Sequence, residues 1–395
     1  MADRDAFLVS ACRTAIGEFL GGLGSLTATQ LGAVAVREAV HRAGIDPKEV
    51  DEVLMGNVVQ AGVGQAPARQ AAIHGGIPDT VPATTINKVC GSGLKAVMLA
   101  AQAIRAGDAD VIVAGGMESM SNGPYYLPKA RLGYRLGNGE LTDGVVVDGL
   151  TCSFKKWHMG SAAELIARKF QVTREDQDRF SVESHRKAVT AMKEGKFQDE
   201  IVPVLVPQRK GEPQPFVVDE RPRPDASMES LGKLKPAFEK DGTVTAGNAP
   251  GLNDGASALV VMSGQAVKRL GLRPLARVTG YAAGGTAPEM LFFAPVIAVR
   301  KLAEKLGRKA NDWDLIEANE AFAAQAIVDA RELEWDPARL NVHGGAVALG
   351  HPIGASGARI LTTLLYAMRD RKAKTGLATL CLGGGNAVAL SVEAV

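Results

Sequence analysis

Apolar residues recur along the chain with a helical period in some segments and in short unbroken runs in others. Five of them are spaced three and four residues apart: Leu94, Val97, Met98, Ala101 and Ile104. This spacing predicts a helix that begins just after Cys90. Apolar, β-branched runs such as 110–116 and 256–262 predict buried strands. Because the two patterns alternate, we expect an α/β protein with mostly parallel or mixed sheets and helices on their faces.

Two parts of the chain carry the same succession of patterns. The matching segments lie 262–264 residues apart: 35–40 with 298–303, 52–57 with 314–319, and 92–93 with 356–357. Three matches in the same order predict two copies of one α/β unit. Ligands in such folds bind at the carboxyl ends of strands. We therefore expect Cys90 of the first copy to meet His351 and Cys381 of the second.

Residues 119–250 differ from the two copies in composition and pattern, and they interrupt the first copy. A glycine-rich stretch (133–149) and a proline-rich stretch (203–236) flank a helix-rich segment (160–196). Strand 256–262 then completes the first copy. The predicted units are an N-terminal half at 1–118 plus 251–270, an inserted loop domain at 119–250, and a C-terminal half at 271–395.

The composition is ordinary for a globular protein, with 46% apolar and 22% charged residues. A net charge of +2 over 395 residues is too balanced for a nucleic-acid-binding protein. The N-terminus leads directly into the strand-like run 7–10, and no apolar run of about 18 residues predicts a membrane span. Four scattered cysteines without CxxC spacing argue against zinc and disulfides. We expect a cytoplasmic protein with no metal and no membrane or nucleic-acid partner.

Cys90 lies where a short polar run, 86–89, meets glycines and the predicted helix. Unpaired backbone N–H groups and the positive end of the helix dipole favour the thiolate, which is the nucleophilic form. Glycines on either side of Ser92 allow another molecule to approach the backbone. The alternative is a buried core cysteine, since free cysteine is among the most buried residue types. This stretch by itself leaves both interpretations open.

Three further segments place polar side chains beside strands or glycines. His351 lies in the glycine-rich loop 344–357, where we expect it to be exposed and fixed in place; a structural loop histidine is the alternative. Asn319 follows a strand, and its alternative is a helix N-cap. Cys381 precedes three glycines, and its alternative is a buried strand cysteine before a turn.

Taken together, these segments resemble the thiolase family, and within it the biosynthetic-type acetoacetyl-CoA thiolases (acetyl-CoA C-acetyltransferases). Each motif is weak alone, but the set follows the family's order over nearly the whole chain. The motifs are 87–93, 115–121, 158–160, 253–256, 319–322, 350–354 and 381–385. The resemblance implies a duplicated α/β unit of two mixed sheets with shared central helices, layered αβαβα, and a loop subdomain inserted in the first copy.

The resemblance also implies an activity and its residues. Thiolases of this type condense two acetyl-CoA molecules to acetoacetyl-CoA and CoA, and run the reverse thiolysis, through an acyl-enzyme intermediate. Cys90 is expected to carry the acyl group and His351 to accept its proton. Cys381 is expected to act as a thiolate that removes a proton from the methyl carbon of the second acetyl-CoA. His351 and a water held by Asn319 would bind the enolate oxygen, and the backbone N–H groups of Cys90 and Gly383 would bind the tetrahedral intermediate.

Substrate-binding residues carry over from the same resemblance. His158 and Met159 are expected along the pantetheine, and Leu150 and Phe322 near the acyl pocket. Arg223 and Ser230 are candidates for the adenosine end of CoA, and a solvated surface charge is the alternative for Arg223. The CoA thioesters are substrates, so no cofactor is implied.

The sequence departs from the family pattern in two places. Many relatives have Asn-Ala-Ser-Gly where residues 248–251 read Asn-Ala-Pro-Gly. Ala249 and Pro250 belong to the expected pantetheine contact, but Pro250 has neither hydroxyl nor N–H. Phe292 and Phe293 stand where many bacterial relatives have small residues. They either narrow the acyl pocket and favour short chains, or pack in the core.

Other functions fit the residues less well. The nearest is a broader-chain degradative 3-ketoacyl-CoA thiolase. The stretch 136–156 resembles the tetramer-forming loop of the biosynthetic type, so we expect that type and a homotetramer. A decarboxylating ketosynthase would have histidine or asparagine in place of Cys381, and a non-catalytic CoA- or lipid-binding member has no need of Cys90, His351 and Cys381 together. A nucleotide-binding Rossmann enzyme is poorly supported, because no GxGxxG follows a strand.

Overall fold

The strands of both copies form one continuous sheet in the computed structural model, which describes residues 2–395. The order along the sheet is β13-β14-β15-β12-β1-β11-β5-β3-β4. These strands are β1 (Ala6–Thr14), β3 (Glu52–Gly56), β4 (Ala83–Ile86), β5 (Val111–Ser119), β11 (Asn253–Ser263), β12 (Ala276–Gly285), β13 (Leu315–Ala318), β14 (Thr375–Leu382) and β15 (Asn386–Ala394). Strands β1 and β12 pair only at Phe7–Arg277 and Leu8–Ala276, so two mixed sheets meet along a short seam.

Both halves have the same strand order. The N-terminal order β1-β11-β5-β3-β4 matches β12-β15-β14-β13 in the C-terminal half, where Leu340 bridges to Ile316 in the place of a fifth strand. The β3–β5 and β13–β14 pairs are parallel, and the β5–β11 and β14–β15 pairs are antiparallel. The duplicated α/β unit predicted from the sequence is confirmed by this topology.

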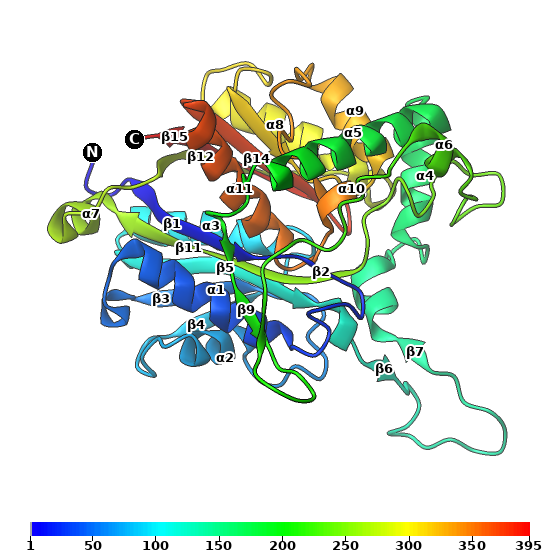
Figure 1. Ribbon diagram of the computed structural model, residues 1–395, viewed down its shortest axis with the longest axis horizontal. Helices are drawn as coiled ribbons and strands as arrows, with labels where there is room; N and C mark the ends of the chain where they lie inside the picture. The colour runs from blue at the N-terminus through cyan, green and yellow to red at the C-terminus, as the bar shows by residue number, and fades with distance from the viewer. Residues whose placement is uncertain (1) are drawn as a thin grey trace.

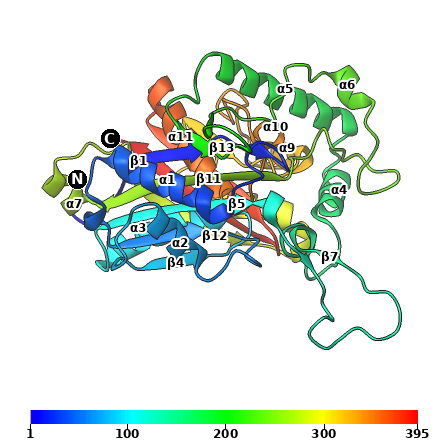
Figure 2. The ribbon, with the colours of Figure 1, turned by 60° about the horizontal axis from the view of Figure 1, so that its bottom comes forward.

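Helices cover the sheets in layers (Figures 1 and 2). The central helices α3 (Ser92–Ala106) and α11 (Ser356–Arg371) pack on each other and contact both sheets. All five apolar residues that predicted α3 are buried. The outer helices are α1 (Ala28–Ala43) and α2 (Pro67–His74) on the first sheet and α8 (Ala294–Lys305) on the second, and α9 (Ala323–Glu332) packs beside α8.

The insertion lies between the end of β5 at Ser119 and the start of β11 at Asn253. Its helices α4 and α5 pack on α9 of the C-terminal half. Strands β6 and β7 form the base of an arm, residues 125–143, that projects from the body (Figures 1 and 2). The elements of the insertion are η2 (Met120–Asn122), β6 (Tyr125–Tyr126), β7 (Thr142–Asp143), η3 (Val145–Leu150), α4 (Met159–Lys169), α5 (Arg174–Lys193), β8 (Ile201–Val202), β9 (Val204–Val206), β10 (Gln214–Phe216) and α6 (Met228–Gly232).

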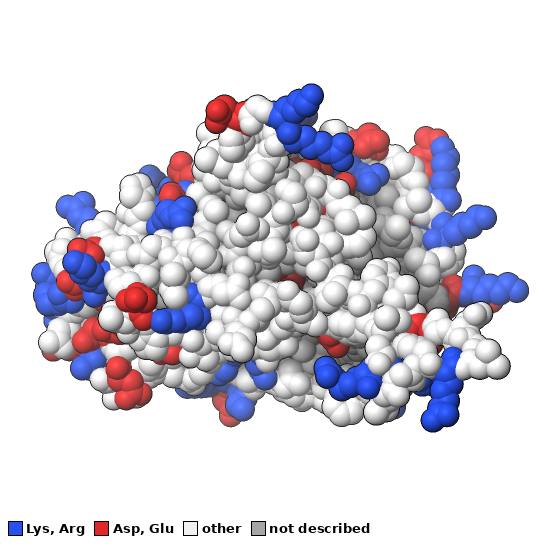
Figure 3. All heavy atoms as spheres, turned by 90° about the horizontal axis from the view of Figure 1, so that it is seen from below, with Lys and Arg blue, Asp and Glu red and all other residues white. Residues whose placement is uncertain are grey.

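Short elements complete the chain: β2 (Gly17–Glu18), η1 (Pro47–Glu49), α7 (Gly264–Leu270), η4 (Pro288–Phe293) and α10 (Ala346–Leu349). On the face shown in Figure 3, charges of both signs lie mostly around the rim and leave an uncharged centre. Within residues 2–395, no helix combines the length and the apolar character that crossing a membrane requires.

Candidate active site

A cavity of about 330 Å³ lies where the two halves and the insertion meet. Ten of the predicted site residues line it: Cys90, Leu150, His158, Met159, Ala249, Pro250, Phe322, His351, Cys381 and Gly383. They come from segments almost 300 residues apart in sequence. The pseudo-symmetry therefore brings both cysteines and the histidine to one apolar cavity.

Cys90 sits in the tight turn between β4 and α3. The preceding Val89 has φ +48°, a left-handed conformation that is strained for a β-branched residue and costs about 1–3 kcal/mol. Ser92 holds this turn, because its Oγ accepts from Lys88 N (2.8 Å) and donates to Val89 O (2.6 Å). The result is a half-buried thiol that faces the cavity at the start of α3.

Burial decides the ionisation of Cys90. It raises the pKa of this thiol to about 12, although the backbone N–H groups of Cys90 and Gly383 both hydrogen-bond toward the sulfur and lower the pKa. The expectation that the helix start leaves Cys90 as a thiolate is therefore wrong for the free protein. The two N–H groups nevertheless converge on one point beside the sulfur.

His351 is buried, with 7% of its surface exposed, which contradicts the expected exposed position. Its loop is tightly held: His351 N donates to Asn253 Oδ1 (2.9 Å), and Gly350 has φ +106°. The His351 Nδ1 atom lies 2.6 Å from Ser356 Oγ, and this hydroxyl donates its proton to Pro352 O (2.9 Å). The Nδ1 atom must then be the protonated nitrogen, which leaves the Nε2 lone pair free to accept a proton.

The surroundings keep the His351 ring neutral. Burial, followed by the charge of Arg359, lowers the pKa of His351 to about 3. Asn319 lies behind the cavity wall, with Nδ2 3.5 Å from His351 Nε2. Its Oδ1 is buried without a hydrogen-bond partner among residues 2–395. Asn319 is not a helix cap, because the N-cap of α9 is Phe322.

Cys381 lies near the end of β14, 1% exposed and packed among Leu291, Phe292 and Phe322. Burial raises its pKa well above the ordinary value, and Cys90 raises it further. Both cysteines line the same cavity. In the free protein Cys381 is therefore a neutral thiol, and the thiolate expected from the resemblance has to form during the reaction.

Aromatic side chains form one wall of the cavity. His158 stacks on Phe238 with ring centroids 4.7 Å apart, Phe238 meets Phe322 edge-on at 6.2 Å, and Phe322 meets Phe292 at 5.4 Å. Phe238 was not among the predicted residues. It follows the proline-rich stretch in a segment without periodic pattern, so the sequence offers no signal for it.

Comparison with known proteins agrees with this geometry. The family model of the thiolase N-terminal domain matches residues 6–265, and that of the thiolase C-terminal domain matches residues 272–394. This chain belongs to the thiolase family.

Named relatives cover nearly the whole thiolase chain. An acetyl-CoA acetyltransferase of Chromobacterium violaceum is 57% identical over 386 residues, 98% of each chain. One of Escherichia coli is 54% identical over 391 residues, 99% of each chain. The crystal structure of the Bacillus anthracis acetyl-CoA acetyltransferase superposes with a TM-score of 0.97 at 44% identity, covering 99% of both chains.

The neighbouring residues Phe292 and Phe293 have different surroundings. Phe292 is buried and lines the cavity. Phe293 is absent from the cavity lining and stacks on Phe170 with ring centroids 5.4 Å apart. Phe292 alone of the two is therefore placed to limit the acyl chain, and Phe293 is partly buried and packs against the core.

Arg223 and Ser230 do not line the cavity. Arg223 is exposed, and its backbone N–H donates to His185 Nδ1 (3.1 Å). Ser230 lies in the first turn of α6, where its backbone N–H donates to Oγ of the N-cap residue Ser227 (3.1 Å). Both lie on the insertion, and their contact with the adenosine end of CoA stays a prediction.

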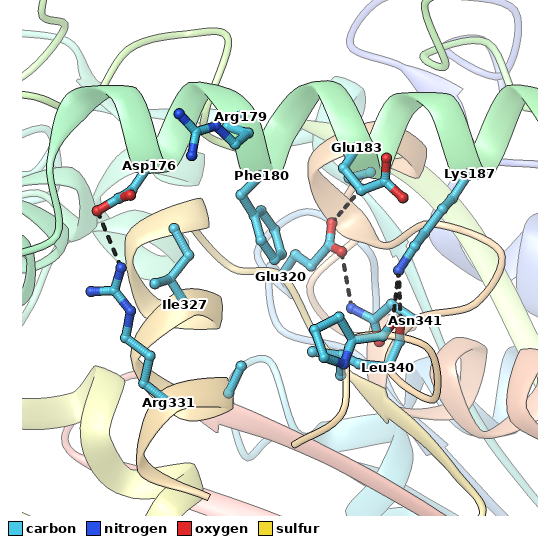
Figure 4. Close-up of a pocket in the computed structure, with 13 residues that line it drawn as sticks. Asp176, Arg179, Phe180, Glu183, Lys187, Glu320, Ile327, Arg331, Leu340 and Asn341 are labelled. Atoms are coloured by element: carbon cyan, nitrogen blue, oxygen red, sulfur yellow. Dashed lines mark hydrogen bonds and ion pairs between the residues drawn. The ribbon is translucent and has the colours of Figure 1, made fainter. Parts of the chain in front are cut away.

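A second pocket of about 320 Å³ lies between α5 and α9 (Figure 4). Its polar groups already have protein partners: Arg331 pairs with Asp176 (3.2 Å), and Lys187 donates to Leu340 O (2.9 Å). Glu320 on its wall accepts from Asn341 (2.9 Å). The thiolase cavity, by contrast, presents reactive groups. Within residues 2–395 there is no cluster of three or more His, Cys, Asp or Glu side chains suited to a metal.

Proposed function

We propose that this thiolase condenses two acetyl-CoA molecules to acetoacetyl-CoA and CoA and catalyses the reverse thiolysis. The observation that carries the proposal is one apolar cavity that contains two neighbouring thiols, a neutral imidazole and two convergent N–H groups. The relatives named acetyl-CoA acetyltransferase, which match nearly the full chain, support the same substrate. The substrates are acetyl-CoA, acetoacetyl-CoA and CoA, and the reaction needs no cofactor.

The first half-reaction acylates Cys90. Its sulfur attacks the thioester carbonyl while His351 Nε2 takes the thiol proton. Because the two resting pKa values, about 12 and about 3, oppose separate ionisation, proton transfer accompanies the attack. The N–H groups of Cys90 and Gly383 donate to the oxyanion, and each such donor lowers the barrier by about 3 kcal/mol. The carbon–sulfur bond to CoA then breaks, and the leaving CoA sulfur takes the proton of Cys381.

The second half-reaction forms the carbon–carbon bond. The Cys381 thiolate removes a proton from the methyl group of the second acetyl-CoA. His351, now protonated at Nε2, and a water held by Asn319 donate to the enolate oxygen. The enolate carbon attacks the acyl carbonyl and Cys90 leaves as a thiolate, which recovers its proton from His351. Cys381 keeps the methyl proton, so all three groups return to their starting states.

We also propose that the protein is a cytoplasmic homotetramer. Leucines at the tip of the projecting arm are almost wholly exposed: Leu132 by 92% and Leu136 by 108% of their reference surface. Exposed apolar side chains on a projecting segment are typical of an interaction site. The uncharged centre of the face in Figure 3 supports a second contact surface between subunits. Four free cysteines are consistent with a reducing compartment.

The direct test is cleavage of acetoacetyl-CoA followed through its enolate absorbance. The wild-type protein should show a CoA-dependent loss of signal, and Cys90→Ala should show none. A wild-type protein without CoA-dependent cleavage would refute the proposed function. A series of longer 3-ketoacyl-CoA substrates separates this activity from that of a degradative thiolase, because the wall formed by Phe292 should favour the four-carbon substrate.

A further inference from the structure

Glu118, the second-last residue of β5, is fully buried and does not line the cavity. Its carboxyl group accepts four hydrogen bonds. Oε1 accepts from Asn57 Nδ2 (2.8 Å) and Val59 N (3.2 Å). Oε2 accepts from Val58 N (3.0 Å) and Gly354 N (2.9 Å).

The donors to Glu118 belong to two segments that carry the active site. Gly354 lies in the loop of His351, three residues after it. The segment 57–59 holds the approach to Cys90, because Asn57 N donates to Ile86 O (3.0 Å) and Asn87 Nδ2 lies 3.4 Å from Val58 O. Glu118 therefore links the turn of the first half that carries Cys90 to the loop of the second half that carries His351.

The approach at Gly354 leaves no space for a side chain. A Cβ atom there would lie 2.6 Å from Met117 O and 2.8 Å from Glu118 Oε2. A Cβ atom on Gly116 would lie 2.0 Å from Gly354 O. Two glycines thus let β5 and the histidine loop touch backbone to backbone, and the carboxylate closes this contact.

We propose that ionised Glu118 is a positioning residue that holds the His351 loop in register with Cys90; this rests on the proposed function. Every partner of the carboxyl group is an N–H donor, and a carboxylate accepts from all of them. A protonated oxygen turns its hydrogen toward a donor and loses at least one bond. A glutamine amide loses both bonds at its nitrogen. Only the ionised acid fits the site.

The hydrogen bonds through which Glu118 links the two segments should be lost as the pH falls. Burial, with a smaller contribution from Asp254 on β11, raises the pKa of Glu118 to about 7 against the lowering effect of its backbone N–H donors. The charge of Glu118 in turn acts on Cys90 and is one of the influences that raise the pKa of Cys90 to about 12. His351, three residues before Gly354, has a pKa of about 3, and its Nδ1 atom is hydrogen-bonded to Ser356. Because the ionised form is the competent one, kcat should rise with pH through a midpoint near 7.

The test compares Glu118→Gln with Glu164→Gln. Glu164 is the matched control, since its buried carboxylate also accepts backbone N–H groups, from Thr243 (2.8 Å) and Val244 (2.7 Å). Glu118→Gln should lower kcat about 100-fold, the cost of a misplaced catalytic group, with KM changed less than about twofold. It should also lack the acid limb near pH 7, which Glu164→Gln should keep.

Two results would overturn the proposal: kcat of Glu118→Gln within about threefold of wild type, or a low kcat with the wild-type acid limb intact. If Glu118→Gln does not fold, Glu118→Asp decides. The aspartate side chain is shorter by one methylene, so Glu118→Asp should lower kcat about tenfold and retain the acid limb. An unchanged kcat would contradict the positioning role of Glu118. Wild-type activity that is absent, or unaffected by Cys90→Ala, would instead refute the proposed function.

Discussion

The two halves of this thiolase place an equivalent turn before an equivalent helix and use it in opposite ways. The turn before α3 carries Cys90, and the residue 264 positions later, in the turn before α11, is Gly354. The N–H of Cys90 points toward its own sulfur beside the cavity, whereas the N–H of Gly354 is bound by the Glu118 carboxylate. In the proposed reaction, the N–H group of the first copy donates to the substrate oxyanion. In the second copy, the Glu118 carboxylate accepts from the equivalent N–H group, that of Gly354.

Equivalent residues on the strands β5 and β14, and equivalent serines at the starts of α3 and α11, also have different roles in the two halves. Cys381 on β14 lines the cavity, while its counterpart on β5, Met117, packs in the core of the N-terminal half. Ser92 holds its own turn, and its counterpart Ser356 holds the His351 ring. The two copies therefore share one backbone frame and differ in the side chains at the positions that the proposed reaction uses.

The largest expected effect comes from replacing the residue that makes the first turn reactive. Cys90→Ala should lower thiolysis by at least about 10⁴-fold, because no covalent intermediate can form. Assay of acetoacetyl-CoA cleavage checks this. Cys12→Ala is the control, since Cys12 is buried and only donates to Ala35 O (3.2 Å). Cleavage by Cys90→Ala within tenfold of wild type would show that the turn before α3 does not carry the nucleophile.

Ser356→Ala should give the next largest effect. It removes the acceptor that fixes the proton on His351 Nδ1, so part of the population would carry the wrong tautomer. We expect kcat to fall about 10- to 100-fold, the range of a general acid–base contribution only partly lost, with KM nearly unchanged. Ser181→Ala is the control, because Ser181 is equally buried but donates only to Gln177 O. Equal kcat values for both variants would show that Ser356 is merely structural.

The two phenylalanines of η4 allow a comparison within one segment. Phe292→Val should enlarge the acyl end of the cavity and raise the ratio of kcat/KM for a six-carbon over a four-carbon 3-ketoacyl-CoA about tenfold, as one or two methylenes in an apolar pocket allow. Phe293→Val should lower Tm and leave this ratio unchanged. A ratio that shifts equally in both variants would contradict their separate placement.

Pro250→Ser should have the smallest effect. Pro250 lines the cavity and offers neither a hydroxyl nor an N–H. An added serine should lower the KM for acetyl-CoA two- to threefold, equivalent to a weak neutral hydrogen bond of about 0.5 kcal/mol. Initial-rate kinetics measures this change, and an unchanged KM would show that the pantetheine does not contact residue 250.

Local pattern was enough to predict the secondary structure and much of the site. The spacing of Leu94 to Ile104 predicted α3, and the internal repeat predicted the duplicated topology. The repeat also predicted that Cys90, His351 and Cys381 would meet, because equivalent strand ends face each other across the pseudo-twofold. These features depend on period and order, which a sequence displays directly.

Properties that depend on burial could not be predicted from local pattern. The helix start argued for a Cys90 thiolate, but desolvation in the assembled cavity raises the pKa to about 12. His351 looked exposed among glycines, yet those glycines allow close packing that buries it. The Glu118–Gly354 hydrogen bond joins residues 236 apart, and Phe238 enters the wall from an unpatterned loop. Such contacts exist only once the chain has folded.

The proposed mechanism divides the work between two thiols: Cys90 carries the acyl group, and Cys381 moves the methyl proton. The most direct measurement incubates Cys381→Ala with acetyl-CoA in deuterated water and follows two signals by mass spectrometry: the mass of the protein and the deuterium content of the recovered methyl group. We expect a protein acetylated at Cys90, formed more slowly than in the wild type because water must protonate the leaving CoA sulfur, with no deuterium in acetyl-CoA and no acetoacetyl-CoA. Methyl exchange or normal condensation by Cys381→Ala would contradict the division of labour between the two cysteines.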